Sequence, residues 1–220
     1  MKKLLFGAFC VFLAAYMISI SGCRTRVASA PGPEWTITLT ATATIYLTPT
    51  ITPTSAPVSL TYDFEGSLDG WSKGGGTGFT AIAYVLASSV PGGVVISGNY
   101  CLSATCSFLV AIPTPTTDGE VVVNPVPSDL SAVSQITAHV YVPADMPAGY
   151  SVQVFVLTGT GYAFAGQNDA TPTLGAWNTV TLNTSGIANM NNVDAIAVQI
   201  LRNSGPAWSG TIYVDDVTVN

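Results

Sequence analysis

The chain has 220 residues, of which 48% are hydrophobic and only 8% are charged, and its formal net charge is −6. Between residues 58 and 220 there are two basic and eleven acidic side chains, and a surface of that sign repels phosphate backbones. These numbers argue against nucleic acid as a partner and leave uncharged polymers as candidate ligands.

The first segment, residues 1–22, is predicted to be an export signal. Two lysines precede an uncharged stretch, residues 4–20, which ends in small residues just before Cys23. This order is typical of a secretory signal peptide. The tetrapeptide Ile-Ser-Gly-Cys that ends at Cys23 resembles a bacterial lipobox, which implies a lipid on Cys23 and an exported, membrane-anchored protein. A plain membrane-spanning anchor is the alternative, because about 17 apolar residues just suffice to cross a bilayer.

Residues 23–57 are predicted to be the lipidated cysteine followed by a linker. Thr, Ala and Pro dominate residues 36–57, and the run TPTITPT at residues 48–54 is repetitive. A Pro-rich segment of this kind builds no hydrophobic core and extends by about 3 Å per residue. We expect it to act as a spacer between the membrane and a folded domain that comprises residues 58–220.

From residue 58 onward, hydrophobic and polar residues alternate with a period of two, as on half-buried β-strands. Candidate strands occur at residues 60–64, 79–87, 94–97, 107–112, 136–142, 152–156, 162–166, 178–182, 196–200 and 212–217. Gly, Pro, Asn and Asp separate these runs, and no long helical period is visible. The pattern predicts an all-β fold, a two-sheet antiparallel β-sandwich or jelly roll of about ten strands.

Two cysteines, Cys101 and Cys106, lie within the expected domain. An even pair in an exported protein favours a disulfide. A metal site is the alternative, but the chain offers one histidine and no second cysteine pair to complete a set of ligands.

The side chains that alternate with the apolar positions point to a candidate binding face. If the strands at residues 136–142, 152–156 and 196–200 share a sheet, their outward residues lie on one face. These outward residues are His139, Tyr141, Gln153, Phe155 and Gln199. Aromatic rings can cover the apolar face of a sugar while amides reach its hydroxyl groups. The alternative is that Tyr141 and Phe155 pack beneath a loop or an outer strand.

A second aromatic pair, Tyr162 and Phe164, stands two residues apart and therefore shares one side of a strand. The pair is equally compatible with a sugar-stacking patch and with the hydrophobic core.

Several short segments, in this order and spacing, resemble one known family. They are YDFE at residues 62–65, GW at 70–71, DLS at 129–131, ITAHVYVP at 136–143, WNTVTL at 177–182, VDAIAVQI at 193–200 and GTIYVDDV at 210–217. They are similar to the β-jelly-roll carbohydrate-binding modules attached to bacterial mannanases and endoglucanases. The resemblance implies a non-catalytic domain, a concave sheet that binds a β-linked polysaccharide, and often a structural calcium ion.

The same resemblance places the calcium ligands on Glu65 and Asp215. These carboxylates stand near the two ends of the domain, where jelly-roll termini usually pair as adjacent strands. Calcium binds six to eight oxygen atoms from carboxylates and carbonyl groups. Hydrogen bonding of the carboxylates to turn amides is the alternative.

The sequence does not indicate an enzyme. It contains a single histidine, no Gly-x-Ser-x-Gly or His-Glu-x-x-His motif, and no pair of carboxylates that stands out as catalytic. Two hypotheses follow: a surface protein that binds a mannan- or glucan-type polysaccharide, or a structural or adhesive surface protein that uses its sandwich for protein contacts.

Overall fold

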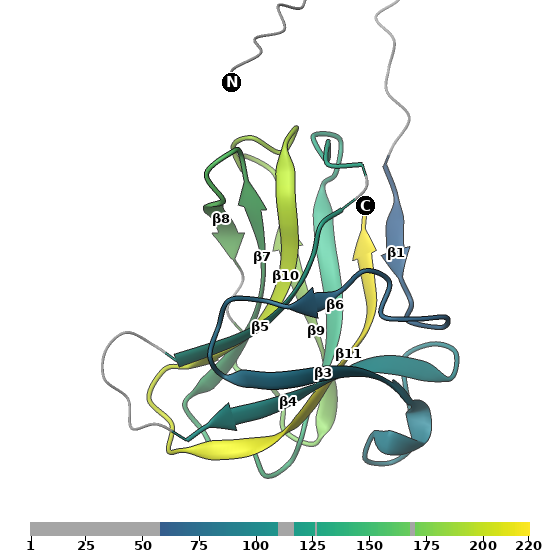
Figure 1. Ribbon diagram of the computed structural model, residues 1–220, viewed down its shortest axis with the longest axis vertical. Helices are drawn as coiled ribbons and strands as arrows, with labels where there is room; N and C mark the ends of the chain where they lie inside the picture. The colour runs from purple at the N-terminus through teal and green to yellow at the C-terminus, as the bar shows by residue number, and fades with distance from the viewer. Residues whose placement is uncertain (1–57, 110–116, 126, 168–169) are drawn as a thin grey trace, which may run out of the picture. The chain divides into compact units, whose positions relative to one another are not determined.

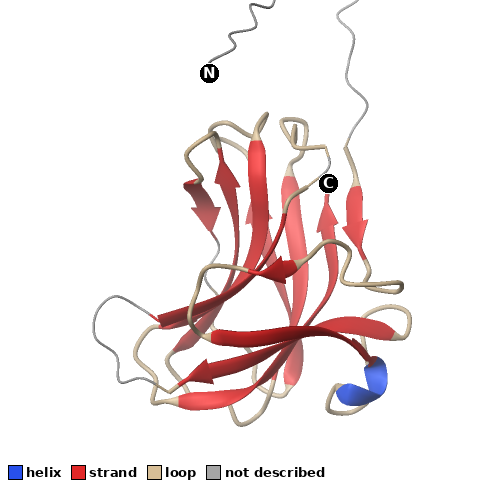
Figure 2. Cartoon of the chain, in the orientation of Figure 1, coloured by secondary structure: helices blue, strands red, loops and turns tan. Residues whose placement is uncertain are grey.

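The computed structural model describes residues 58–109, 117–125, 127–167 and 170–220. The expected signal peptide, Cys23 and the linker lie outside these residues and stay predictions. The described residues form eleven strands and one 3-10 helix (Figures 1 and 2). The elements are β1 (Leu60–Tyr62), β2 (Ser72–Lys73), β3 (Phe79–Leu86), η1 (Ala87–Ser89), β4 (Tyr100–Phe108), β5 (Thr117–Val123), β6 (Gln135–Val142), β7 (Tyr150–Thr158), β8 (Ala163–Gln167), β9 (Ala176–Asn183), β10 (Val193–Arg202) and β11 (Trp208–Val219). In this part of the chain, no helix has the length and hydropathy needed to cross a membrane.

The strands form two antiparallel sheets, which confirms the predicted sandwich. Sheet A has the order β3-β4-β11-β6-β9, with β1 also paired to β11, and sheet B has the order β2-β5-β10-β7-β8. The twelve-residue strand β11 pairs with β4 along its first half and with β1 along its second half. A bulge separates the two halves, and Asp216 adopts a positive φ of 44° there.

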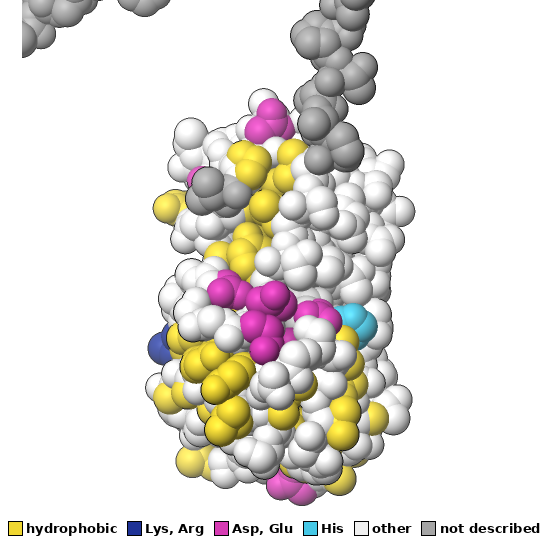
Figure 3. Space-filling view, turned by 90° about the vertical axis from the view of Figure 1, so that its right-hand side faces the viewer, with side chains coloured by type: hydrophobic (Ala, Val, Ile, Leu, Met, Phe, Trp, Pro, Cys, Tyr) yellow, Lys and Arg dark blue, Asp and Glu magenta, His cyan; other side chains and the backbone are white. Residues whose placement is uncertain are grey.

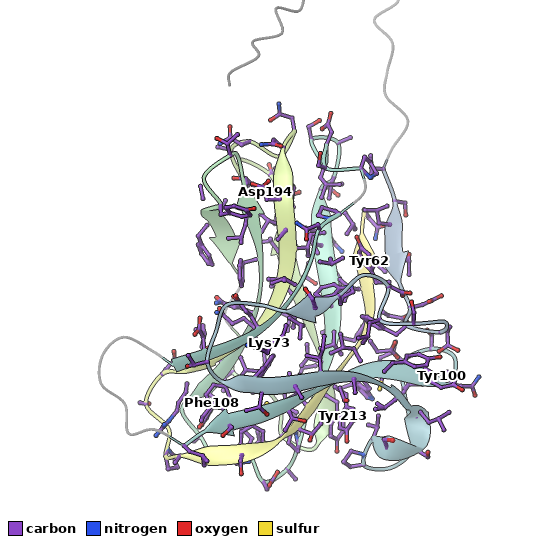
Figure 4. The ribbon with its side chains drawn as sticks, in the orientation of Figure 1. Tyr62, Lys73, Tyr100, Phe108, Asp194 and Tyr213 are labelled. Atoms are coloured by element: carbon purple, nitrogen blue, oxygen red, sulfur yellow. The ribbon has the colours of Figure 1, made fainter. Side chains whose placement is uncertain are left out.

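The hydrophobic core lies between the two sheets, where alternate residues of the strands point inward. Ile136 and Val140 of β6 and Ile196 and Ile200 of β10 are completely buried, as the period-two pattern predicts. Burial of each such side chain stabilises the fold by about 1.5–3 kcal/mol. Aromatic rings close one end of the core, where Phe108 (Figure 4) packs at 5.4 Å from Tyr150 in a T-shaped arrangement.

The predicted disulfide between Cys101 and Cys106 is absent, and both residues are free, buried cysteines. Both lie on β4, and their separation of five residues directs their side chains to opposite faces of sheet A. Cys106 belongs to the main core, whereas Cys101 packs against Tyr141 and Tyr213 on the outer side. Five residues of extended chain span about 16 Å, well beyond the roughly 7 Å between Cα atoms that a disulfide tolerates. Burial raises the pKa of both thiols to about 12.

The predicted strand at residues 94–97 is also wrong, because these residues form a loop between η1 and β4. The backbone N–H groups of Ile96 and Ser97 donate to Asp215 Oδ2, at 2.8 and 3.2 Å, instead of to a neighbouring strand. Conversely, β5 was not expected, since Asp118, Gly119 and Glu120 interrupt the hydrophobic pattern at its start.

Candidate functional site

The side chains predicted to share one face lie on two different sheets. His139 and Tyr141 belong to β6 in sheet A, whereas Gln153 and Phe155 of β7 and Gln199 of β10 belong to sheet B. The condition that the strands share a sheet is not met, because residues 143–149 carry the chain from sheet A to sheet B. Since the sheets pack face to face, their outer faces lie on opposite sides of the domain. The predicted single face therefore has to be divided in two.

On the outer face of sheet A, Tyr141 is buried beneath a loop. Its exposed fraction is 7%, and its ring meets Trp177 at 5.7 Å and Tyr213 at 6.0 Å. The loop that follows β3 covers this cluster, and Tyr213 Oη donates a hydrogen bond of 2.6 Å to the carbonyl oxygen of Ser89. His139 is half-buried, and its Nδ1 lies 3.1 Å from Thr179 Oγ1. Tyr141 therefore supports the fold at this place.

On the outer face of sheet B, three polar side chains form a ladder across neighbouring strands. Gln153 faces Gln199 in the β7–β10 register, and Gln199 extends toward Asp118 of β5. Gln153 Nε2 donates to Gln199 Oε1, and Gln199 Nε2 donates to Asp118 Oδ2 at 2.6 Å. Because an ionised carboxylate only accepts hydrogen bonds, Asp118 fixes the orientation of both amides. Among the described residues, none donates a hydrogen bond to the buried Gln153 Oε1.

Next to this ladder lies an aromatic pair from β7 and β8. The rings of Phe155 and Phe164 are 4.8 Å apart and tilted by 34°. Phe155 is only 2% exposed, whereas Phe164 is 52% exposed and Tyr162 is 64% exposed. Phe155 therefore packs beneath Phe164, which is the solvent-facing ring of the pair, while Tyr162 is exposed in the turn before β8 and, contrary to the prediction, does not share a strand with Phe164. Tyr162 also adopts a positive φ of 52°, a conformation that costs energy in a residue other than glycine.

Sequence reasoning missed a further polar residue of sheet B, Asp194 (Figure 4), which lies at the start of β10, five residues before Gln199. It lies in a bulge of β10, where the register shifts between Val193 and Ala195. Its Oδ2 atom is buried and has no hydrogen-bond partner among the described residues. The bulge explains the omission, because an extra residue in the strand breaks the alternation from which outward residues were assigned.

Glu65 and Asp215, the predicted calcium ligands, hold the loop before β4 in place. Glu65 Oε1 accepts hydrogen bonds from the N–H groups of Asn99 and Tyr100, at 2.8 and 3.0 Å. Asp215 Oδ2 accepts the two N–H groups of the loop at Ile96 and Ser97. We call Glu65, Asp215 and the loop residues 96–100 the carboxylate clamp. Figure 3 shows acidic side chains gathered on this side of the domain, near the histidine.

The clamp contains one buried carboxyl group, and the side chains that could hold a metal ion there are few. Asp215 is fully buried, and this burial raises the pKa of its carboxyl to about 6, while the N–H groups of Ser97 and Ile96 act in the opposite direction. No three Asp, Glu, His or Cys side chains of the described residues come together to hold a metal. A calcium ion held by Glu65 and Asp215 would therefore need backbone carbonyl oxygens and water as its other ligands.

Comparison with known families identifies the fold and its relatives. A family model described as the galactose-binding-like domain of mannanases matches residues 62–216. The chain belongs to this family. The match begins at Tyr62 and ends at Asp216, so it includes both sheets, the polar ladder and the carboxylate clamp. No curated protein matches the chain.

Solved structures of low sequence identity share the sandwich fold of this family member. One describes carbohydrate-binding modules of the β-sandwich superfamily with promiscuous specificity, with a TM-score of 0.54 and 15% identity over 71% of this chain. The chain spans 59% of that structure. The family 11 module of a cellulosomal cellulase of Clostridium thermocellum matches with a TM-score of 0.51 and 15% identity, over 75% of this chain and 95% of the module. A module specific for non-crystalline cellulose matches with a TM-score of 0.51 and 14% identity, over 69% and 88%.

Proposed function

We propose that this protein is a non-catalytic surface protein that binds a neutral, β-linked polysaccharide of the mannan or glucan type. The ligand lies on the outer face of sheet B, across the polar ladder and the exposed rings. One observation carries the proposal: Gln153 Oε1 is a buried acceptor to which no described residue donates, and it lies on the same strand as the ring that supports the half-exposed Phe164.

The chemistry of this face suits a sugar. A buried acceptor without a donor costs about 1–3 kcal/mol, and a sugar hydroxyl that donates to it removes that cost. The ring of Phe164 offers an apolar surface to the C–H face of a pyranose, and about 100 Å² of such burial contributes about 2.5 kcal/mol. Asp118 and Glu120 of β5 give this side of the domain a negative charge, which disfavours acidic polymers and leaves neutral glycans.

The relatives support the same class of ligand. The family is described by its occurrence in mannanases, and the family 11 module was solved in complex with a β-1,3-1,4-mixed-linked tetrasaccharide. We therefore expect mannan, glucomannan or mixed-linkage glucan to bind, with a dissociation constant on the order of 10 µM to 1 mM.

Isothermal titration of the protein with these three glycans tests the proposal. Because neutral sugars form no ion pairs, the affinity should change little between low and high salt. The glycan should also be recovered uncleaved after incubation. If none of the three glycans binds, the domain acts instead as a structural or adhesive module that contacts proteins.

We also propose that the protein is held at the cell surface by a lipid on Cys23. The Ile-Ser-Gly-Cys sequence at this position supports this anchor. Cells that express the wild-type protein should incorporate radiolabelled palmitate into it, and Cys23→Ser should abolish the label. Equal labelling of the wild type and the variant would contradict the anchor.

The carboxylate clamp is proposed to bind a structural calcium ion through Glu65 and Asp215. The buried negative charge of Asp215 supports this proposal, since a bound cation would balance it. When bound, calcium would supply charge neutralisation and would fasten the loop over sheet A.

A further inference from the structure

A cavity of about 520 Å³ opens at the end of the domain. It lies between the loop that joins β5 to β6 and the loop that joins β9 to β10, both at the top of Figure 1. We call this cavity the end pocket. Its volume falls within the range of about 300–1,000 Å³ that is typical of small-ligand sites.

The end pocket combines an apolar floor with a rim of uncharged polar groups. Ile187 and Met190 supply the apolar surface, and none of the residues that line the pocket is charged. The polar groups of the rim come from Ser131, Ser134, Ser185 and Asn191. Such a lining disfavours ions, because a charged ligand would lose its hydration without gaining a partner. It favours a neutral molecule with one apolar face and several hydroxyl groups.

The polar groups of the rim can form further hydrogen bonds with a ligand. Ser131 Oγ donates to Asp129 Oδ1 at 2.7 Å, and Ser134 Oγ donates to the carbonyl oxygen of Asn220 at 3.1 Å. Each of these oxygens has thus used its proton and still offers lone pairs to a sugar O–H. The side chains of Ser185 and Asn191 form no hydrogen bond with the described residues, so they can both donate and accept.

Hydrogen bonds between the two loops hold the end pocket in shape. The N–H group of Leu130 donates to the carbonyl oxygen of Met190 at 2.7 Å, and that of Thr184 donates to Ser134 at 3.1 Å. Thr184 Oγ1 donates to the carbonyl oxygen of Val133 at 2.5 Å, and Thr184 is only 3% exposed. A pocket that is formed before binding costs little ordering entropy, which favours affinity for a small ligand.

The walls of the end pocket continue into a polar track on sheet A. Ser134 is followed by Gln135 of β6, and Thr184 is preceded by Asn183 of β9. The outward cross-strand pairs of this track are Gln135 with Asn183, Thr137 with Thr181, and His139 with Thr179. None of these side chains is aliphatic, acidic or a lysine or arginine, and Figure 3 shows a broad area that is neither hydrophobic nor charged. A chain that leaves the end pocket along the track meets only hydrogen-bonding groups.

We infer that the end pocket is a second saccharide site, distinct from the face of sheet B, which binds a neutral hexose unit of a glycan. The sugar hydroxyl groups bond to the rim, and the apolar face of the sugar ring packs on Ile187 and Met190. This inference does not depend on the proposed function of sheet B, because the two sites share no residue.

Amide chemical shifts of the ¹⁵N-labelled protein, titrated separately with D-mannose and D-glucose, test the second site. With at least one of the two sugars, the N–H signals of residues 131–134 and 184–191 should shift in a saturable manner in the millimolar range. Ser185→Trp, at an exposed position of the rim, should fill the pocket and weaken this binding at least tenfold. Thr105→Trp, at an exposed position of β4 outside the pocket lining, is the matched control and should bind as the wild type does.

A third variant separates this inference from the proposed function. Phe164→Ala lies on sheet B and should leave the shifts at residues 131–134 and 184–191 unchanged. The second site is overturned if neither sugar shifts these signals, or if Ser185→Trp binds as tightly as Thr105→Trp. It is equally overturned if Phe164→Ala removes the shifts, because the signals then report binding at sheet B.

Discussion

Replacement of Phe155 by alanine is expected to lower the free energy of unfolding by about 3 kcal/mol, because it removes a buried ring and leaves a cavity beneath Phe164. For a domain of this size, about 1 kcal/mol corresponds to about 2–4 °C, so the thermal midpoint should fall by about 6–12 °C. The matched variant is Phe164→Ala, which removes the half-exposed partner of the same aromatic pair. It should cost only about 1 kcal/mol.

Thermal melts of the two variants distinguish a supporting ring from an exposed one. Equal losses of stability in Phe155→Ala and Phe164→Ala would contradict the arrangement in which one ring packs beneath the other. The comparison needs no ligand, so its outcome does not depend on which glycan the protein binds.

The second large effect is a dependence of stability on pH that originates in the carboxylate clamp. Burial raises the pKa of Asp215 in the folded protein to about 6, from an ordinary value of 3.8. The folded state therefore binds this proton more tightly than the unfolded state does. In the presence of a chelator, the free energy of unfolding should fall by about 2–3 kcal/mol as the pH rises from about 4 through about 6.

Urea denaturation across this pH range measures the effect. Asp215→Asn should flatten the decline, although it also destabilises the clamp, since both carboxylate oxygens accept backbone N–H groups. Millimolar calcium should reduce the decline in the wild type if the ion binds at Glu65 and Asp215. If the free energy of unfolding of Asp215→Asn still declines over this pH range, another group causes the decline. If calcium does not change the pH dependence of the wild type, the calcium site is refuted.

The strands could be predicted from the sequence because their alternation is strong. In β6 and β10, β-branched and small apolar residues recur at every second position and lie in the core. Burial itself does not alternate, because outward residues such as Tyr141 and Gln199 are buried as well. The assignment of strands to sheets is not encoded in this local pattern. Consecutive strands often pair, but β6 and β7 belong to different sheets, and this difference separated His139 and Tyr141 from Gln153 and Phe155.

Other parts of the site depend on contacts between residues far apart in the sequence. The polar ladder requires the register of β5, β10 and β7, and the start of β5 carries no clear hydrophobic alternation. An even pair of cysteines in an exported protein favours a disulfide, but Cys101 and Cys106 lie on one strand, where their odd separation puts them on opposite faces. The i, i+2 spacing of Tyr162 and Phe164 predicts that they share one side of a strand, but only Phe164 lies on β8. Tyr162 lies in the preceding turn with a positive φ, where the period of two does not apply.

The most direct test of polysaccharide binding on sheet B is calorimetric titration of the wild type and of Phe164→Ala with the same soluble β-glycan. We expect the wild type to bind with a dissociation constant on the order of 10 µM to 1 mM. Phe164→Ala should bind at least tenfold more weakly, which corresponds to about 1.4 kcal/mol or more, while it remains folded. A variant that binds as tightly as the wild type, or a wild type that binds none of mannan, glucomannan and mixed-linkage glucan, would contradict the proposed function of this face.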